Sequence, residues 1–353
     1  MTARVMAFAQ RWLLGLMLGC YALAGAFPGP GERLRALRLP WPAVPLTAPM
    51  LLLAVMLANA GLGVRVGDLR GVLRRPSGPV LGVAVNALLP VVLLPAVAVL
   101  LRPWPDAGEV EFLLVGLMLV LAMPIAGGAA SWGQNAGGNV PMIVAMVVGS
   151  TLLSPVTVPL GLRLAGRLVG PSGTGGLDDT ARLDGLAGAA GAGAFALASV
   201  VLPCLAGMAA RALLGERRAA RALPAVKAVN LAVILLLCYV NAAGALARAL
   251  SRPDPDLFVL AFAVPGAVCG LSFLLGGWLS RWPRRDAPDR ISLTFATGMN
   301  NTSAAAVLAS AWFAHRPETL LPILSYSLLQ KVMASVVTRP GVAGRSDTGP
   351  APS

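Results

Sequence analysis

The sequence predicts an all-α integral membrane protein with ten transmembrane helices, and its composition and two interrupted apolar segments carry this prediction. Of the 353 residues, 57% are hydrophobic and only 12% are charged, whereas a soluble domain carries about 25% charged residues. Two of the apolar segments, near 123–139 and 297–303, are broken by glycine and amide residues. Inside lipid a backbone leaves the helix only where protein or a wet cavity satisfies its hydrogen bonds, so paired breaks indicate the substrate site of a carrier.

The ten expected spans are apolar segments of about 20 residues, the length that crosses a bilayer as a helix. A Gly-rich linker at 166–186 separates five spans from five, so the second half would be inverted relative to the first. The expected units are a first repeat at 1–165, a second at 187–338 and a disordered C-terminal tail at 339–353. The spans are expected at 12–28, 46–63, 77–101, 111–134, 139–162, 187–214, 224–248, 256–280, 290–314 and 318–338.

The basic residues predict the orientation and the partners of the chain. With a cytoplasmic N-terminus, the inner segments hold more Lys and Arg than the outer ones, which places both termini in the cytoplasm and the chain in the plasma (inner) membrane. The arginines are scattered between apolar runs, so a net charge of +13 indicates anchoring to the lipid bilayer rather than nucleic-acid binding. The first span is expected to remain as a helix, although Arg4 and Arg11 before it also resemble the start of a signal peptide.

The chain offers no residues from which to build a catalytic or metal site. His315 is the only histidine, the four cysteines show no metal-binding spacing, and the carboxylates fall in loops or at span ends. We therefore expect no enzyme, no metal and no cofactor. A non-transporting membrane sensor stays open as an alternative to a carrier.

Polar residues inside the spans are the candidates for binding. Lys331 is the one clear charge within a span, and it would be either functional or a lysine that snorkels to the cytoplasmic end of the last helix. Lone amides such as Asn241 are more typical of helix–helix contacts. The expected substrate or ion ligands are Ser131, Gln134, Asn135, Asn86, Asn300, Asn301, Thr302 and Lys331.

The helix breaks themselves are expected at Pro124, Gly127, Gly128 and Gly298, near 127–131 and 298–301. Glycine adopts backbone conformations that other residues avoid, which is the expected reason for the glycines at these positions. We expect Asn301 to have the ligand as its partner.

Three stretches of the chain resemble the bile acid:sodium symporter family and its arsenite-carrier relatives. The resemblance covers about residues 12–338 and implies a core domain (spans 3–5 and 8–10) and a panel domain (spans 1, 2, 6 and 7). It also implies that the fourth and ninth helices unwind and cross beside the substrate cavity. The motifs are LANAGLGV at 57–64 with Arg75-Pro76 and Asn86, MPIAGGAAS at 123–131 with STLLSPVTVP at 150–159, and TGMNNTSAA at 297–305 with Tyr326-Ser327.

Departures from the family pattern put its sodium sites in doubt. Ala296 stands where the family has a glutamate, Ile143 and Val147 stand where hydroxyl ligands are expected, and Lys331 aligns with an asparagine. The resemblance therefore implies an alternating-access carrier of a small organic anion, with sodium possible but doubtful. Lys331 would replace sodium or bind a proton. An auxin-efflux-type or other inverted-repeat carrier is the alternative.

Overall fold

The computed structural model describes residues 12–39, 46–65, 67, 71–72, 74, 76–169, 185–186, 188–251, 254–281 and 286–338. The expected tail at 339–353 and most of the expected linker at 166–186 lie outside the described residues.

The described chain is almost entirely helical, as predicted. Only a two-residue antiparallel pair, with Arg38 opposite Thr47, adds strand. The elements are α2 (Leu13–Ala26), α3 (Pro28–Ala36), β1 (Arg38–Leu39), β2 (Leu46–Thr47), α4 (Ala48–Gly63), α6 (Ser77–Leu100), α7 (Ala107–Ala122), α8 (Ala129–Asn135), α9 (Val140–Val169), the π-helical turns η2 (Ala189–Gly193) and η3 (Leu197–Val201) with α11 (Ala194–Ala196) between them, α12 (Leu202–Ser251), α13 (Pro255–Leu279), α14 (Ala287–Gly298), α15 (Thr302–Trp312), the 3-10 helix η4 (Pro317–Thr319) and α16 (Leu320–Val337).

Length and apolar composition mark five helices among the described residues as long enough to cross a membrane, or six if α2 and α3 count as one bent span. The number is lower than the predicted ten for physical reasons. Two expected spans are broken in the middle, α4 is only 16 residues long, and α12 joins two expected spans in one helical stretch. Gly215 interrupts that stretch with φ +73°, a conformation that glycine adopts at little cost.

The first expected span is also shorter than predicted, because the chain turns at the C-terminal end of α2. Phe27 leaves the helical conformation, and Pro28 then begins α3 at 91° to α2. Proline has no N–H to continue the ladder of α2 but is well suited to the first turn of a new helix.

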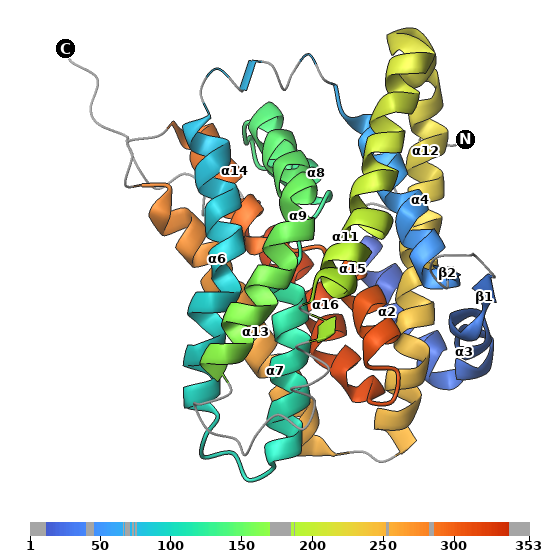
Figure 1. Cartoon of the computed structure of the whole chain (residues 1–353), viewed down its shortest axis with the longest axis vertical. Helices are drawn as coiled ribbons and strands as arrows, with labels where there is room; N and C mark the ends of the chain where they lie inside the picture. Colours follow the sequence, from blue (N-terminus) through green and yellow to red (C-terminus); the bar gives the residue numbers. More distant parts are fainter. Residues whose placement is uncertain are drawn as a thin grey trace.

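The helices pack in two groups. In Figure 1, α3, α4 and α12 lie on the right, α6, α13 and α14 lie on the left, and α15 and α16 lie between them. The α12 group consists of α2, α3, α4 and α12; the α16 group consists of α6–α9 and α13–α16. The groups meet where α12 contacts α15, η4 and α16, where α4 contacts α15, and where α2 contacts α16.

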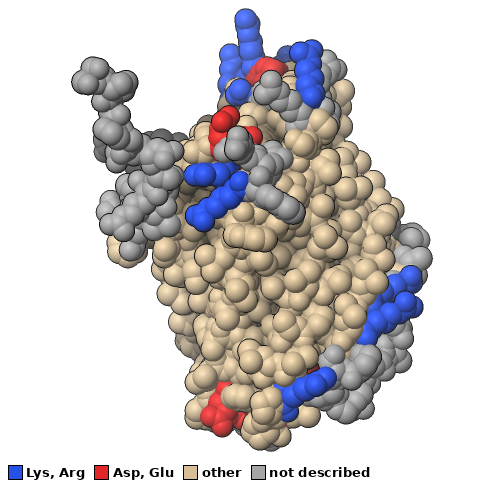
Figure 2. Space-filling model, turned by 90° about the vertical axis from the view of Figure 1, so that its left-hand side faces the viewer, with Lys and Arg blue, Asp and Glu red and all other residues tan. Residues whose placement is uncertain are grey.

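The surface between the two ends of the molecule is apolar. Large side chains such as Val80, Leu88 and Val92 on α6 and Leu274 on α13 are more than half exposed. On the face in Figure 2, charged side chains gather toward the ends and one edge, and the broad middle of the described surface has none. This distribution fits helices that contact lipid along their middle.

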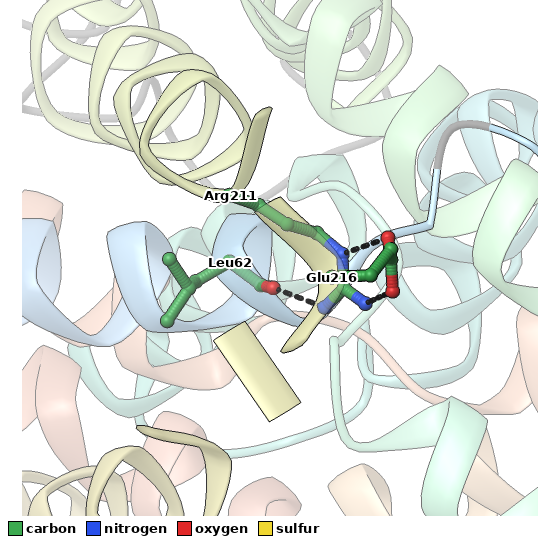
Figure 3. A network of polar contacts seen from close by, with 3 residues as sticks. All are labelled: Leu62, Arg211 and Glu216. Atoms are coloured by element: carbon green, nitrogen blue, oxygen red, sulfur yellow. Dashed lines mark hydrogen bonds and ion pairs between the residues drawn. The ribbon is translucent and has the colours of Figure 1, made fainter. Parts of the chain in front are cut away.

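An arginine joins α4 to α12 beside the Gly215 interruption. Arg211 on α12 donates from Nη1 to the Leu62 carbonyl at 2.9 Å and pairs with the Glu216 carboxylate at 2.7 Å (Figure 3). The contact ties the last turn of α4 to the residue that follows the Gly215 interruption. Because only 5% of the Arg211 side chain is exposed, both of these partners are needed to offset its desolvation.

Helices α4 and α12 approach so closely that only glycine fits at their crossing. A Cβ on Gly207 would lie 1.9 Å from the Ala58 carbonyl oxygen, and one on Gly61 would lie 2.1 Å from the Cys204 carbonyl oxygen. Small residues allow such backbone contact between membrane helices.

We expect Gly207→Ala to destabilise the protein by about 1–3 kcal/mol, since neither backbone can yield without separating the helices. The matched control is Gly19→Ala on α2, where a Cβ would meet no atom within 4 Å. Thermal unfolding of both variants in detergent measures the difference. Equal melting temperatures would contradict close packing at this crossing.

Candidate functional site

Two helices of the α16 group are interrupted, and their interruptions cross. Residues 123–128 separate α7 from α8, and residues 299–301 separate α14 from α15. Ile125 and Asn300 form an antiparallel bridge. The Ala126 N–H donates to the Met299 carbonyl, and the Asn301 N–H donates to the Pro124 carbonyl, both at 2.9 Å. Each interruption therefore supplies backbone partners to the other, as a break inside lipid requires.

The first break contains Pro124, Gly127 and Gly128 of the expected break residues. Ser131 already lies in α8, and Gly298 is the last residue of α14. A serine of α9 satisfies a backbone group of the first break, because the Ser150 hydroxyl accepts from the Ile125 N–H at 3.1 Å.

The expected reason for these glycines is wrong. Among the described residues only Gly137 and Gly215 have positive φ, and Gly128 has φ −62°. Gly298 is needed for space instead, because a Cβ there would lie 2.4 Å from the ring of Phe273.

A chain of buried polar side chains runs from α6 through the crossing to α16. Asn86 Nδ2 donates to Asn300 Oδ1 at 2.7 Å, and the Asn300 backbone N–H donates to Gln330 Oε1 at 3.2 Å. Gln330 Nε2 then donates to Thr302 Oγ1 at 3.4 Å, and the Thr302 hydroxyl contacts Ser327 Oγ at 3.0 Å. The structure thus brings together three of the predicted ligands, Asn86, Asn300 and Thr302.

Lys331 joins the end of this chain. Its Nζ donates to the Ser327 carbonyl at 2.8 Å and to Ser327 Oγ at 3.2 Å. Ser327 lies one turn before Lys331, so the ammonium is bound toward the crossing and not toward the end of α16. In the structure, the Lys331 side chain therefore does not snorkel toward the end of α16. Among the described residues no carboxylate forms an ion pair with this ammonium.

The remaining predicted ligands lie elsewhere. Ser131, Gln134 and Asn135 are exposed on α8 and take no part in the network around Lys331. Asn301 is buried next to the crossing, but its Oδ1 accepts from the Ala304 N–H at 3.1 Å and so caps α15. Its expected partner was a ligand, whereas in the structure this oxygen has a backbone partner.

Ser327 and Gln330 are the residues that sequence reasoning missed. They lie three positions apart on α16, and Lys331 lies four after Ser327, so the three share one helical face. Polar residues at this spacing in an apolar helix would have indicated a buried polar face. Gln330 is only 2% exposed, and its amide bonds Asn300 within the second break and Thr302 just after it.

A small cavity of about 20 Å³ lies beside this face, between the two helix groups. It exceeds the roughly 10–15 Å³ that one water needs. The lining comes from α2 and α12 on one side and α15 and α16 on the other: Tyr21, Leu237, Cys238, Asn241, Thr302, Ser303, Ala306, Ile323, Leu324 and Ser327.

The positions where the family pattern would place sodium ligands are packed with apolar side chains. Ala296 and Ile143 are fully buried, and the Val147 carbonyl accepts from the Ser150 hydroxyl. The described residues contain no group of three or more His, Cys, Asp or Glu side chains suited to a metal ion. The oxygen atoms at the crossing that could coordinate a cation therefore belong to amides, hydroxyls and backbone carbonyls.

We expect Gln330→Met to destabilise the protein by about 1–3 kcal/mol, because it leaves the buried Asn300 N–H without its acceptor. Gln134→Met is the matched control, since that side chain is exposed on α8. Chemical unfolding of the two variants compares them. If the Gln330 variant is as stable as the control, the amide does not hold the break.

The chain is similar to known proteins of one family. The model of the Sodium Bile acid symporter family matches residues 50–252. Two proteins of Bacillus subtilis (strain 168) are similar to the chain. The uncharacterized sodium-dependent transporter YocS is 26% identical over 81% of this chain and 80% of its own length. The uncharacterized protein YbaS is 26% identical over 63% of this chain and 67% of its own length.

Members of this family are transporters and not enzymes. The chain belongs to the Sodium Bile acid symporter family and is a multi-pass membrane transporter of that kind.

Proposed function

We propose that the chain carries a small organic anion across the membrane by alternating access. The observation that carries this proposal is the bond between Lys331 and Ser327, which attaches a fixed cation to the crossing of two broken helices. Helix breaks that cross expose backbone dipoles and polar side chains to a ligand. A half-buried ammonium that forms no ion pair with a carboxylate of the described residues favours a ligand with negative charge.

The transporter would have ten helices in two inverted repeats, with α7–α8 and α14–α15 as corresponding broken helices. The α16 group corresponds to the core and the α12 group to the panel that the family resemblance implies. Their packing supports this assignment, because each group is closely packed and the contacts between them are fewer. In each cycle the α16 group would rock against the α12 group.

Transport would not depend on sodium. The apolar packing at Ala296 and Ile143 leaves no carboxylate or hydroxyl for a cation there, and dehydrating sodium without such ligands is costly. Lys331 would supply the positive charge, either permanently or by binding and releasing a proton in each cycle. The relative YocS is named as a sodium-dependent transporter, so transport without sodium would distinguish this chain from it and needs a direct test.

The carrier would lie in the plasma (inner) membrane with both termini in the cytoplasm. Its partners would be the anionic substrate and the lipid bilayer. Ser131, Gln134 and Asn135 on α8 remain proposed ligands of the substrate in another conformation of the cycle, since they are exposed next to the first break.

We expect anion uptake into proteoliposomes to proceed equally with sodium or with choline outside. Lys331→Ala should lower uptake at least about tenfold, because a hydrogen bond to a charged group contributes roughly 1.5–3 kcal/mol. Lys331→Gln should keep the packing but lose the charge, and its uptake should fall as well. Uptake of radiolabelled monocarboxylates gives the measurement.

Lys227→Gln is the control, since this lysine is exposed on α12. Strict dependence on sodium would contradict the proposed coupling. Full activity of both Lys331 variants would contradict the role of the ammonium. The absence of uptake for every anion would contradict the proposed function itself.

A further inference from the structure

Helix α3 leaves α2 at 91° and rests on the side of α12. The Tyr239 hydroxyl of α12 donates to the Phe27 carbonyl at 2.7 Å, which fixes the corner between α2 and α3. Gly31 of α3 packs closely on α12, since a Cβ there would lie 2.6 Å from the Ala243 Cβ. These contacts hold α3 against one short stretch of α12, at the right-hand edge of Figure 1.

The same packing brings the Arg35 guanidinium onto the backbone of α12. A Cβ on Gly244 would lie 2.8 Å from Arg35 Nη2 and 3.0 Å from Nη1. Arg35 is half-buried, yet it forms no hydrogen bond and no ion pair with another described residue. A guanidinium has five N–H donors, and partial burial of a charge without a partner costs free energy. The structure therefore holds a fixed cation that lacks an anion.

A second arginine faces the same place. Gly244 and Arg248 lie one turn apart on one face of α12, and Arg248 repels the Arg35 guanidinium electrostatically. Two carboxylates lie nearby: Glu32 of α3 attracts Arg35 without an ion pair, and Glu318 of η4 pairs with Arg248 at 3.6 Å. Because 57% of the Arg248 side chain is exposed, its pair with Glu318 leaves other N–H donors available.

The surroundings of the two arginines are apolar on the side of the bilayer. Gly244 lies within the apolar stretch expected to span the membrane at 224–248, and Arg248 is the last residue of that stretch. Phe27 at the corner and Leu250 of α12 are 64% and 55% exposed. Arginines at the edge of an apolar membrane surface lie at the level of lipid headgroups.

We propose that Arg35 and Arg248 bind the phosphate of an anionic phospholipid. The phosphate oxygens would accept from both guanidinium groups, whose planar forks match this geometry. The negative charge would offset the repulsion between the arginines, and the acyl chains would lie along Phe27 and Leu250. The exposed Arg33 on α3 adds a third cation to the two carboxylates, so phosphatidylglycerol is favoured over zwitterionic phosphatidylcholine. This site is separate from the helix crossing and does not rest on the proposed transport function.

Lipid titration of the delipidated full chain in detergent tests this site. The probes are dioctanoyl phosphatidylglycerol, dioctanoyl phosphatidylcholine and inorganic phosphate, followed by melting temperature and by lipid adducts in native mass spectrometry. Wild type should bind phosphatidylglycerol at least about fivefold more tightly than phosphatidylcholine and should not respond to inorganic phosphate at the same concentration. Arg35→Gln should raise the Kd of phosphatidylglycerol about 10- to 100-fold, the effect of losing a hydrogen bond between charged groups.

Two further variants separate lipid binding from net charge. Gly244→Ala keeps every charge, but its Cβ would displace the Arg35 guanidinium, so phosphatidylglycerol should bind more weakly to this variant as well. Arg218→Gln removes an exposed arginine near the other end of α12 and should bind the lipid as wild type does. Without lipid, Arg35→Gln should melt no lower than wild type, because it removes a charge that has no partner.

Three results would overturn the lipid site. Equal binding of the two lipids by wild type would show that no anionic headgroup is selected. An unchanged Kd in Arg35→Gln would exclude this guanidinium from the site. A response to inorganic phosphate as strong as that to phosphatidylglycerol would indicate a site for a free anion instead of a lipid.

Discussion

The backbone hydrogen bonds between the two helix breaks are the constraint on which the rest of the structure depends. A helix that stops inside an apolar protein leaves several N–H and C=O groups without partners. Here the segments at 123–128 and 299–301 satisfy one another through an antiparallel bridge. Neither break is tenable alone, so α7, α8, α14 and α15 must be held at one place and at one register.

Side chains of α16 bond polar groups at the second break that the backbone bridge does not reach. Gln330 reaches the Asn300 N–H and Thr302, and Ser327 continues the chain to Lys331. These contacts fix the position of a charged group relative to two helix ends without any carboxylate. The arrangement costs free energy to bury, and a ligand of opposite charge would recover part of that cost.

The two groups of helices differ in what joins them. The α12 group is closely packed at glycines and is tied by Arg211 to the end of α4. The α16 group is joined through the crossing and its polar side chains. Between the groups lies a small cavity whose walls are partly polar. Polar contacts that a ligand or water can replace are suited to an interface that opens and closes, whereas the glycine crossing is suited to a body that stays rigid.

The sequence by itself determined the all-helical membrane architecture and the places where two apolar segments are interrupted, because hydropathy and helix-breaking residues act locally along the chain. It also proposed Asn86, Asn300, Thr302 and Lys331 as ligands. It also indicated the family through short motifs. Only the tertiary structure decided which polar residues meet. Asn301 caps α15, the α8 residues stay exposed, and Gly298 is required by Phe273, which lies on another helix. Ser327 and Gln330 gained their roles in the same way, since a hydrogen-bond partner brought from a distant helix leaves no mark on the local sequence.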